Sequence, residues 1–294
     1  MTWFLNFLRG GAVGTSEALP GISGGTVALI VRLYDDLING AGHVLGGIRL
    51  TLTDGVRGRG LGAAKEEFKR GQWNVLIPAL LGMATFLIIA IVILEPIVHN
   101  HTQIVYAAFF GLVLGSLPIP YQESRSRWKL WNYGLALLFA IAAFLLLGLP
   151  RVDVVISLWT VFLSAAVAIC ALVIPGLSGS FILLTFGMYE PTLTAVRSVD
   201  IPYILTFAAG AATGLTAFVK LLQYLLTHKR HITMVILTGL MAGSLRALWP
   251  WDNQALDGPE TPMFGLIIAM VIGLAVVTSI LWLERRHTLT AQSH

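Results

Sequence analysis

Seven long, nearly uncharged runs of apolar residues dominate the chain and constrain its fold more than any other feature. They cover residues 73–98, 103–118, 130–149, 154–174, 203–226, 232–248 and 263–283. Most are long enough to cross a hydrocarbon layer of roughly 30 Å, which takes about 20 helical residues. Only 12% of the 294 residues are charged and 56% are hydrophobic, which excludes a water-soluble globular enzyme. The sequence predicts an all-α polytopic membrane protein.

Two further apolar stretches contain a Pro-Gly-x-Ser-Gly cluster, which a continuous helix disfavours. One cluster lies within residues 3–38, and the other follows Ile174. Non-helical backbone is tolerated at membrane depth only where protein or a wet cavity supplies hydrogen-bond partners. We therefore expect two re-entrant helical hairpins, at residues 3–38 and 154–200.

The distribution of Lys and Arg predicts the orientation, because basic loops stay on the cytoplasmic side. The segment 39–72 is predicted to be a cytoplasmic loop because it carries Arg49, Arg57, Arg59, Lys65, Lys69 and Arg70. If residues 154–200 form a hairpin that enters and leaves on the outer side, the basic positions 229, 230, 285 and 286 lie inside. A single crossing at 154–174 would reverse that order and violate the rule. Both termini are then predicted to be cytoplasmic.

Sequence matches within the chain predict an internal repeat. Residues 20–25 match residues 175–180 at an offset of 155, and residues 111–117 match residues 239–245 at an offset of 128. The offsets differ by 27 residues, about the length of the basic segment after the first hairpin. The predicted copies are residues 1–150 and 151–294, each a hairpin followed by three transmembrane helices. Because three is odd, the copies would be inverted relative to each other, which is typical of transporters.

The two Pro-Gly-x-Ser-Gly turns are candidate anion sites. Each precedes a helix whose N-terminal amides carry a partial positive charge and favour a phosphate. The hydroxyls of Ser23, Thr26, Ser178 and Ser180 could add donors to phosphate oxygens. The alternative is that Gly and Ser only allow tight helix packing at these turns.

Three ionisable residues are candidates for a role beside the turns. Glu17 could accept a proton or Na+, or it could anchor the first turn by bonding backbone amides. Arg32 could attract a phosphate, and the alternative is an arginine that snorkels to the cytoplasmic surface. Arg246, near the outer end of its helix, could contact an anion. Snorkelling also accounts for Lys220.

No metal, cofactor or nucleic-acid partner is expected. The pairs His99/His101 and His228/His231 lie in polar loops without carboxylate or cysteine companions. The net charge of +4 sits in short loops, where it sets orientation rather than nucleic-acid binding. Residues 65–70 could form an amphipathic helix on the anionic inner leaflet, or a solvated loop.

The residues around the two turns resemble the prokaryotic polyprenyl-phosphate (undecaprenyl-phosphate) transporter family, formerly a domain of unknown function. They are Gly-Thr-Ser-Glu-Ala-Leu-Pro-Gly-Ile-Ser-Gly-Gly-Thr at 14–26 and Ile-Pro-Gly-Leu-Ser-Gly-Ser at 174–180, with Met-Tyr-Glu at 188–190. The resemblance implies head-group or coupling roles for Ser16, Glu17, Ser23, Gly24, Gly25, Thr26, Ser178, Gly179 and Ser180. The second turn has Leu172 and Ser180 where the first has Glu17 and Gly25, which leaves equal roles for the two turns open.

The resemblance also implies a flippase of the bacterial or archaeal cytoplasmic membrane. Its substrate would be undecaprenyl phosphate or a related polyprenyl phosphate, returned across the membrane so that the carrier lipid is recycled for peptidoglycan and other cell-envelope synthesis. The chain has no P-loop, so we expect transport to follow a lipid gradient or an H+ or Na+ gradient. Two alternatives stay open: a transporter of a small soluble anion, and an intramembrane lipid-phosphate enzyme, although the apolar segments offer no catalytic set. The sequence does not predict the oligomeric state.

Overall fold

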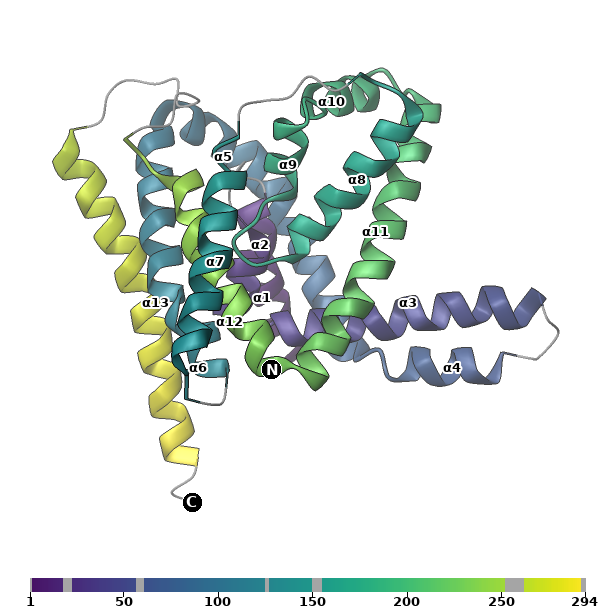
Figure 1. Ribbon diagram of the computed structural model, residues 1–294, viewed down its shortest axis with the longest axis horizontal. Coiled ribbons are helices and arrows are strands. Elements are labelled where there is room, and N and C mark those ends of the chain that lie inside the picture. The colour runs from purple at the N-terminus through teal and green to yellow at the C-terminus, as the bar shows by residue number, and fades with distance from the viewer. Residues whose placement is uncertain are drawn as a thin grey trace. The chain divides into compact units, whose positions relative to one another are not determined.

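The computed structural model describes residues 2–17, 23–56, 61–124, 127–149, 155–251 and 262–291 (Figure 1). Within these ranges every regular element is a helix, as predicted. The elements are α1 (Thr2–Glu17), α2 (Gly24–Ile30), α3 (Tyr34–Val56), α4 (Gly62–Lys69), α5 (Trp73–Ser116), α6 (Pro118–Glu123), α7 (Leu130–Leu146), α8 (Leu158–Val173), α9 (Gly179–Thr185), α10 (Tyr189–Arg197), α11 (Ile201–His228), α12 (Arg230–Ser244), the 3-10 helix η1 (Leu245–Leu248) and α13 (Met263–Ala291).

Five helical segments of the described chain are long and apolar enough to cross a membrane. They are Trp73–Ala90, His101–Glu123, Ile201–His228, Arg230–Leu248 and Met263–Trp282, and the apolar helices α7 and α8 are shorter. The long helix α5 breaks at His101, whose φ of −134° and ψ of 34° are not helical, and which lies between the predicted runs 73–98 and 103–118. Large apolar side chains such as Leu130 and Phe264 are exposed, as lipid-facing residues would be. The chain is therefore a multi-pass membrane protein.

The two interrupted stretches are each built from three helices. The first contains α1, α2 and α3, and the second contains α8, α9 and α10. The middle helices α2 and α9 both have seven residues, and both follow a serine with an extended backbone, Ser23 and Ser178. The predicted breaks are therefore confirmed, whereas the re-entrant path of each stretch through a membrane stays a prediction.

The two middle helices also end in the same way. After α2 the amide of Leu33 donates to the carbonyl of Ala28, and after α9 the amide of Met188 donates to Leu183, both at 2.8 Å. A residue with positive φ precedes each donor, Arg32 at 54° and Gly187 at 65°. This is the hydrogen-bond pattern of a Schellman cap. Each matched pair is 155 residues apart, which is the offset found in the sequence.

The described chain packs into two compact units. One contains Met1–Ile88 and Pro150–Thr233, and the other contains Ile89–Leu149 and Met234–His294. Both interrupted stretches belong to the first unit, whereas the second unit takes two of the three predicted transmembrane helices from each predicted repeat. Compact units and sequence repeats are different divisions of a chain, so the repeats at 1–150 and 151–294, and their inversion, stay predictions.

Glycines allow the helices of each unit to approach closely. In the first unit, a Cβ at Gly210 of α11 would overlap the carbonyl oxygen of Phe162 in α8, and a Cβ at Gly82 of α5 would overlap that of Phe7 in α1. Small residues serve the same purpose between transmembrane helices generally. The two contacts correspond, because Phe7 and Phe162 are 155 residues apart and Gly82 and Gly210 are 128 apart. Both sequence offsets therefore reappear in the packing.

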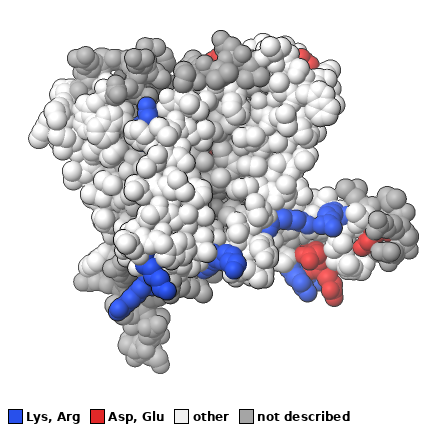
Figure 2. Space-filling model, viewed as in Figure 1, with Lys and Arg blue, Asp and Glu red and all other residues white. Residues whose placement is uncertain are grey.

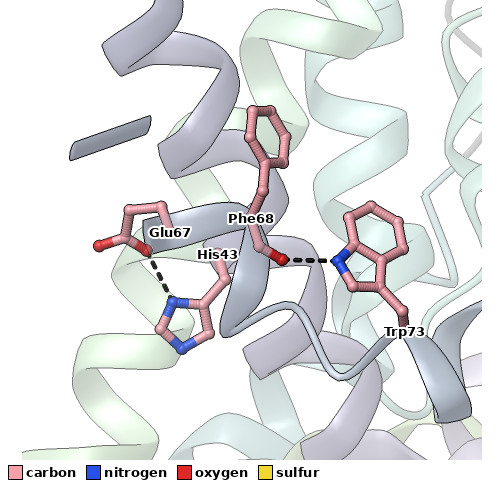
Figure 3. A network of polar contacts seen from close by, with 4 residues as sticks. All are labelled: His43, Glu67, Phe68 and Trp73. Atoms are coloured by element: carbon pink, nitrogen blue, oxygen red, sulfur yellow. Dashed lines mark hydrogen bonds and ion pairs between the residues drawn. The ribbon is translucent and has the colours of Figure 1, made fainter. Parts of the chain in front are cut away.

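The segment 39–72, predicted to be a loop, contains most of α3 and all of α4, which lie side by side as an arm (Figure 1). The ring of Phe68 packs against Gly47 across the two helices, and the indole Nε1 of Trp73 donates to the carbonyl of Phe68 (Figure 3). Lys and Arg lie beside Asp and Glu on this arm (Figure 2). Residues 65–70 are thus mostly helical, and their contact with a lipid surface stays a prediction.

Candidate functional site

The first turn is held by Glu17, the last residue of α1. Its Oε1 accepts a hydrogen bond of 3.0 Å from the amide of Gly24, the first residue of α2. A Cβ at Gly24 would overlap the Glu17 carboxyl group, so only glycine leaves room for this contact. A carboxylate at a helix N-terminus is favoured by the amide dipoles. Glu17 therefore anchors the first turn through a backbone amide, which is one of the two roles predicted for it. The amide it binds is one of those at the N-terminus of α2 that were predicted to bind a phosphate.

The second turn contacts the first through its backbone, at the amide of Gly176 and the carbonyl of Ile174. The amide of Gly176 donates to Oγ1 of Thr26 at 2.8 Å and to Oγ of Ser23 at 3.2 Å. The hydroxyl of Ser23 in turn donates to the carbonyl of Ile174 at 3.3 Å. Gly176 has a φ of 90°, a conformation that favours glycine. The structure therefore brings the two turns together, and the hydroxyls of one bind the backbone of the other.

Gly25 allows this close approach. A Cβ at Gly25 would lie 3.2 Å from both the nitrogen of Pro175 and the carbonyl oxygen of Val173, which is tighter than ordinary contact. In the second stretch the corresponding residue is Ser180, whose hydroxyl lies 2.8 Å from that of Ser178. At this position the first stretch has no side chain, whereas the second has a hydroxyl beside that of Ser178.

The remaining hydroxyls and glycines lie next to these contacts. Ser16 is buried and donates to the carbonyl of Val13 within its own helix at 2.6 Å. Ser23, Thr26 and Ser178 are also buried, at 7%, 1% and 5% exposure. A Cβ at Gly179 would lie 2.7 Å from the carbonyl of Ala168, so Gly179 sets the approach of α9 to α8. All of these positions belong to the first compact unit.

The two arginines are held elsewhere. Arg246, in the second unit, donates to the carbonyl of Phe144 at 3.2 Å, and its guanidinium lies 4.3 Å from the centroid of the Phe144 ring. That position near the end of α7 suits a cation, because helix C-termini carry partial negative charge. Arg32 is exposed and forms part of the cap that ends α2. Their roles in anion binding stay predictions.

Charged groups surround the start of α3. Arg230 Nη1 lies 2.8 Å from Asp35 Oδ2, which joins the start of α12 to the residues that follow the first turn. Burial, and then the charge of Asp35, raise the pKa of the neighbouring Asp36, while Arg9 of α1 lowers it. This ion pair ties Arg230 to the start of α3 within the first compact unit.

Sequence reasoning did not identify two features. The first is the Gly176 amide, because the partner of a backbone donor depends on tertiary structure. The second is a cavity beside Lys220, although the polar residues at 220, 223, 224, 227 and 228 have the spacing of one helix face. That spacing is the signal from which the polar face of α11 could have been predicted.

Comparisons with a family model and with named proteins all point to the same family. The VCA0040-like family, described as undecaprenyl phosphate translocase-like, matches residues 13–264, which include both turns. A protein of Vibrio cholerae serotype O1 named polyprenyl-phosphate transporter is 30% identical over 97% of each chain. A protein of the same name from Staphylococcus aureus is 27% identical over 93% of this chain and 94% of its own. No solved structure matches. The chain therefore belongs to the undecaprenyl phosphate translocase-like family.

Proposed function

We propose that this chain carries undecaprenyl phosphate, or a related polyprenyl phosphate, across the cytoplasmic membrane and binds its phosphate between the two turns. The family and the names of the two relatives support this substrate. The multiple apolar helices support a membrane location. The isoprenoid tail can stay in hydrocarbon while the charged head group crosses, so the protein needs a polar path for the phosphate alone.

The hydrogen bonds between the turns carry the proposal. Buried hydroxyls and amides need partners, and here the Gly176 amide and the hydroxyls of Ser23 and Thr26 satisfy one another. A phosphate oxygen could replace each of these contacts, because it accepts from both amides and hydroxyls. The arrangement is then the closed, empty state, and a phosphate would separate the turns by taking over their donors.

Glu17 would couple this exchange to a proton. Its carboxylate holds the Gly24 amide, and protonation would weaken that charge-assisted bond. The freed amide would then be available to the incoming phosphate at the N-terminus of α2. In this scheme one proton enters as one phosphate binds, which makes the inward return of the lipid sensitive to the pH gradient.

A liposome assay tests the proposal. Labelled polyprenyl phosphate is followed between the leaflets at set pH and Na+ gradients, with native protein and with Ser23→Ala/Thr26→Val. We expect the double variant to slow transfer by about tenfold or more, since each lost hydrogen bond to a charged group is worth about 1.5–3 kcal/mol. Ser198→Ala, an exposed serine at the end of α10, serves as the matched control.

Three outcomes separate the alternatives. Glu17→Gln should transfer lipid at a rate that no longer depends on pH, and an unchanged pH dependence would reject proton coupling. Competition by long-chain but not short-chain polyprenyl phosphates supports a lipid substrate, whereas equal competition by a small soluble phosphate ester would favour a soluble-anion transporter. Release of inorganic phosphate by purified protein would instead indicate an enzyme.

A further inference from the structure

A cavity of about 370 Å³ lies between α3, α4 and α11, in the first compact unit. Its lining consists of Gly42, His43 and Gly46 from α3, Glu67 from α4, and Lys220, Gln223, Tyr224, Thr227 and His228 from α11. None of these residues belongs to the two turns. Tyr224, Thr227 and His228 are exposed, so the cavity opens to the surroundings on that side. A volume of this size is within the range of small-molecule sites.

Two glycines on one face of α3 leave the space for this cavity. Gly42 and Gly46 are four residues apart, and a Cβ at Gly42 would overlap Oε1 of Gln223 from α11. A Cβ at Gly46 would lie 3.5 Å from Oε2 of Glu67, at ordinary contact distance. The side chains of α11 and α4 therefore occupy room that larger residues on α3 would fill.

The two histidines of the lining each have one ring nitrogen engaged. His43 Nδ1 lies 2.8 Å from Oε2 of Glu67, and its other ring nitrogen points away from that carboxylate (Figure 3). His228 Nδ1 lies 3.1 Å from the carbonyl of Tyr224, and the His228 ring stacks on the Tyr224 ring. The second ring nitrogen of each histidine, Nε2, is a donor when it carries a hydrogen.

The charges in the lining favour an anion over a metal ion. The carboxylate of Glu67 is already bound by His43, while Lys220 adds a positive charge and Gln223 and Tyr224 add neutral donors. Within the described residues, no group of three or more His, Cys, Asp or Glu side chains is placed to hold a metal. Lysine binds phosphate as a point charge in many proteins.

We infer that this cavity is a second anion site, which binds a phosphomonoester group through Lys220 with hydrogen bonds from Gln223, Tyr224 and the histidines. The inference does not depend on the proposal for the two turns. The phosphate could be free in solution or could be the head group of a membrane lipid, because both present the same three oxygens. The volume of about 370 Å³ leaves room for a phosphate and the first carbons of its ester.

Binding measurements on the full chain test this site. The protein is placed in phosphatidylcholine nanodiscs, and inorganic phosphate is titrated by calorimetry. Native protein should show saturable binding, and Lys220→Gln should lower the affinity by about tenfold or more through loss of a charged hydrogen bond. Lys220→Arg keeps the charge and should retain binding, as should Lys229→Gln, an exposed lysine just beyond α11. Should Lys220→Gln elute or melt abnormally, His228→Gln at the exposed rim should still weaken binding by a smaller factor.

A second titration identifies the source of the phosphate. Polyprenyl phosphate is added to the nanodiscs before inorganic phosphate. Displacement of phosphate by the lipid in native protein indicates a lipid head group, and undisturbed phosphate binding indicates the soluble ion. The inference is overturned if native protein binds neither probe, or if Lys220→Gln and Lys229→Gln bind equally. It is also overturned if Ser23→Ala removes phosphate binding while Lys220→Gln does not, which would place the ion at the turns.

Discussion

The two interrupted stretches have nearly the same backbone but different side chains. Both have a seven-residue middle helix, a serine before it and the same cap after it. Only the first has a carboxylate on its amide, Glu17, where the second has Leu172. Only the first continues into a long helix, since α3 has 23 residues and α10 has nine. The shared backbone therefore forms both turns. The side chains give them different parts, because the first turn has the carboxylate of Glu17 and the second has the Gly176 amide that binds Ser23 and Thr26.

The largest expected effect on stability and transport comes from replacing Glu17 in the first stretch with leucine, the residue at the corresponding position 172 of the second. Glu17→Leu leaves the Gly24 amide without its acceptor, which costs about 1–3 kcal/mol for a buried donor. We expect a clearly lower melting temperature and loss of lipid transfer in liposomes. The matched control is Glu17→Gln, whose amide oxygen can still accept the bond and should preserve the melting temperature. Equal melting temperatures for Glu17→Leu and native protein would show that this bond does not hold the turn.

A stability effect of similar size or smaller is expected where the turns touch. Gly25→Ser copies the second stretch but places a Cβ 3.2 Å from Pro175 and Val173, and overpacking of this kind typically costs about 1–3 kcal/mol. The reciprocal change, Ser180→Gly, removes only the 2.8 Å contact with Ser178, which is worth about 1 kcal/mol. Thermal unfolding of both variants should therefore rank Gly25→Ser as the less stable. The reverse order would mean that the turns separate easily.

The two caps should respond in opposite directions. Gly187→Ala introduces a Cβ at a φ of 65°, which we expect to destabilise the protein by about 1 kcal/mol. Arg32→Gly relieves the same strain at a φ of 54° and should stabilise it by up to about 1 kcal/mol, less what the arginine contacts contribute. Melting temperatures of the two variants, measured side by side, check the comparison. A decrease for both would show that the Arg32 side chain matters more than its backbone.

The sequence predicts the helices well because backbone in hydrocarbon must satisfy its own hydrogen bonds, so apolar runs become helices. The Pro-Gly-x-Ser sequences at 20–23 and 175–178 also predict the breaks, because they disfavour a continuous helix. The contact of Gly176 with Ser23 and Thr26 could not be predicted, because it depends on how two segments 150 residues apart meet. Of the arm, the sequence offered a helix only at 65–70, as an alternative to a loop, because α4 is charged and short and α3 carries little of the apolar signal.

The smallest effect concerns a charge that only the first stretch has. Asp36, whose counterpart is Pro191, has a pKa raised above the usual 3.8 by burial and by Asp35, against the lowering influence of Arg9. At pH values just above 3.8 the folded protein still binds the proton on Asp36, whereas the unfolded chain has released it. The contribution of Asp36 to the free energy of unfolding therefore decreases as the pH rises through this range. Asp36→Asn removes this dependence. Melting temperatures between pH 4 and pH 7 should therefore shift in favour of the variant as the pH increases. Parallel curves for the two proteins would mean that Asp36 titrates alike in the folded and unfolded chain, and that the start of α3 is as open to water as that of α10.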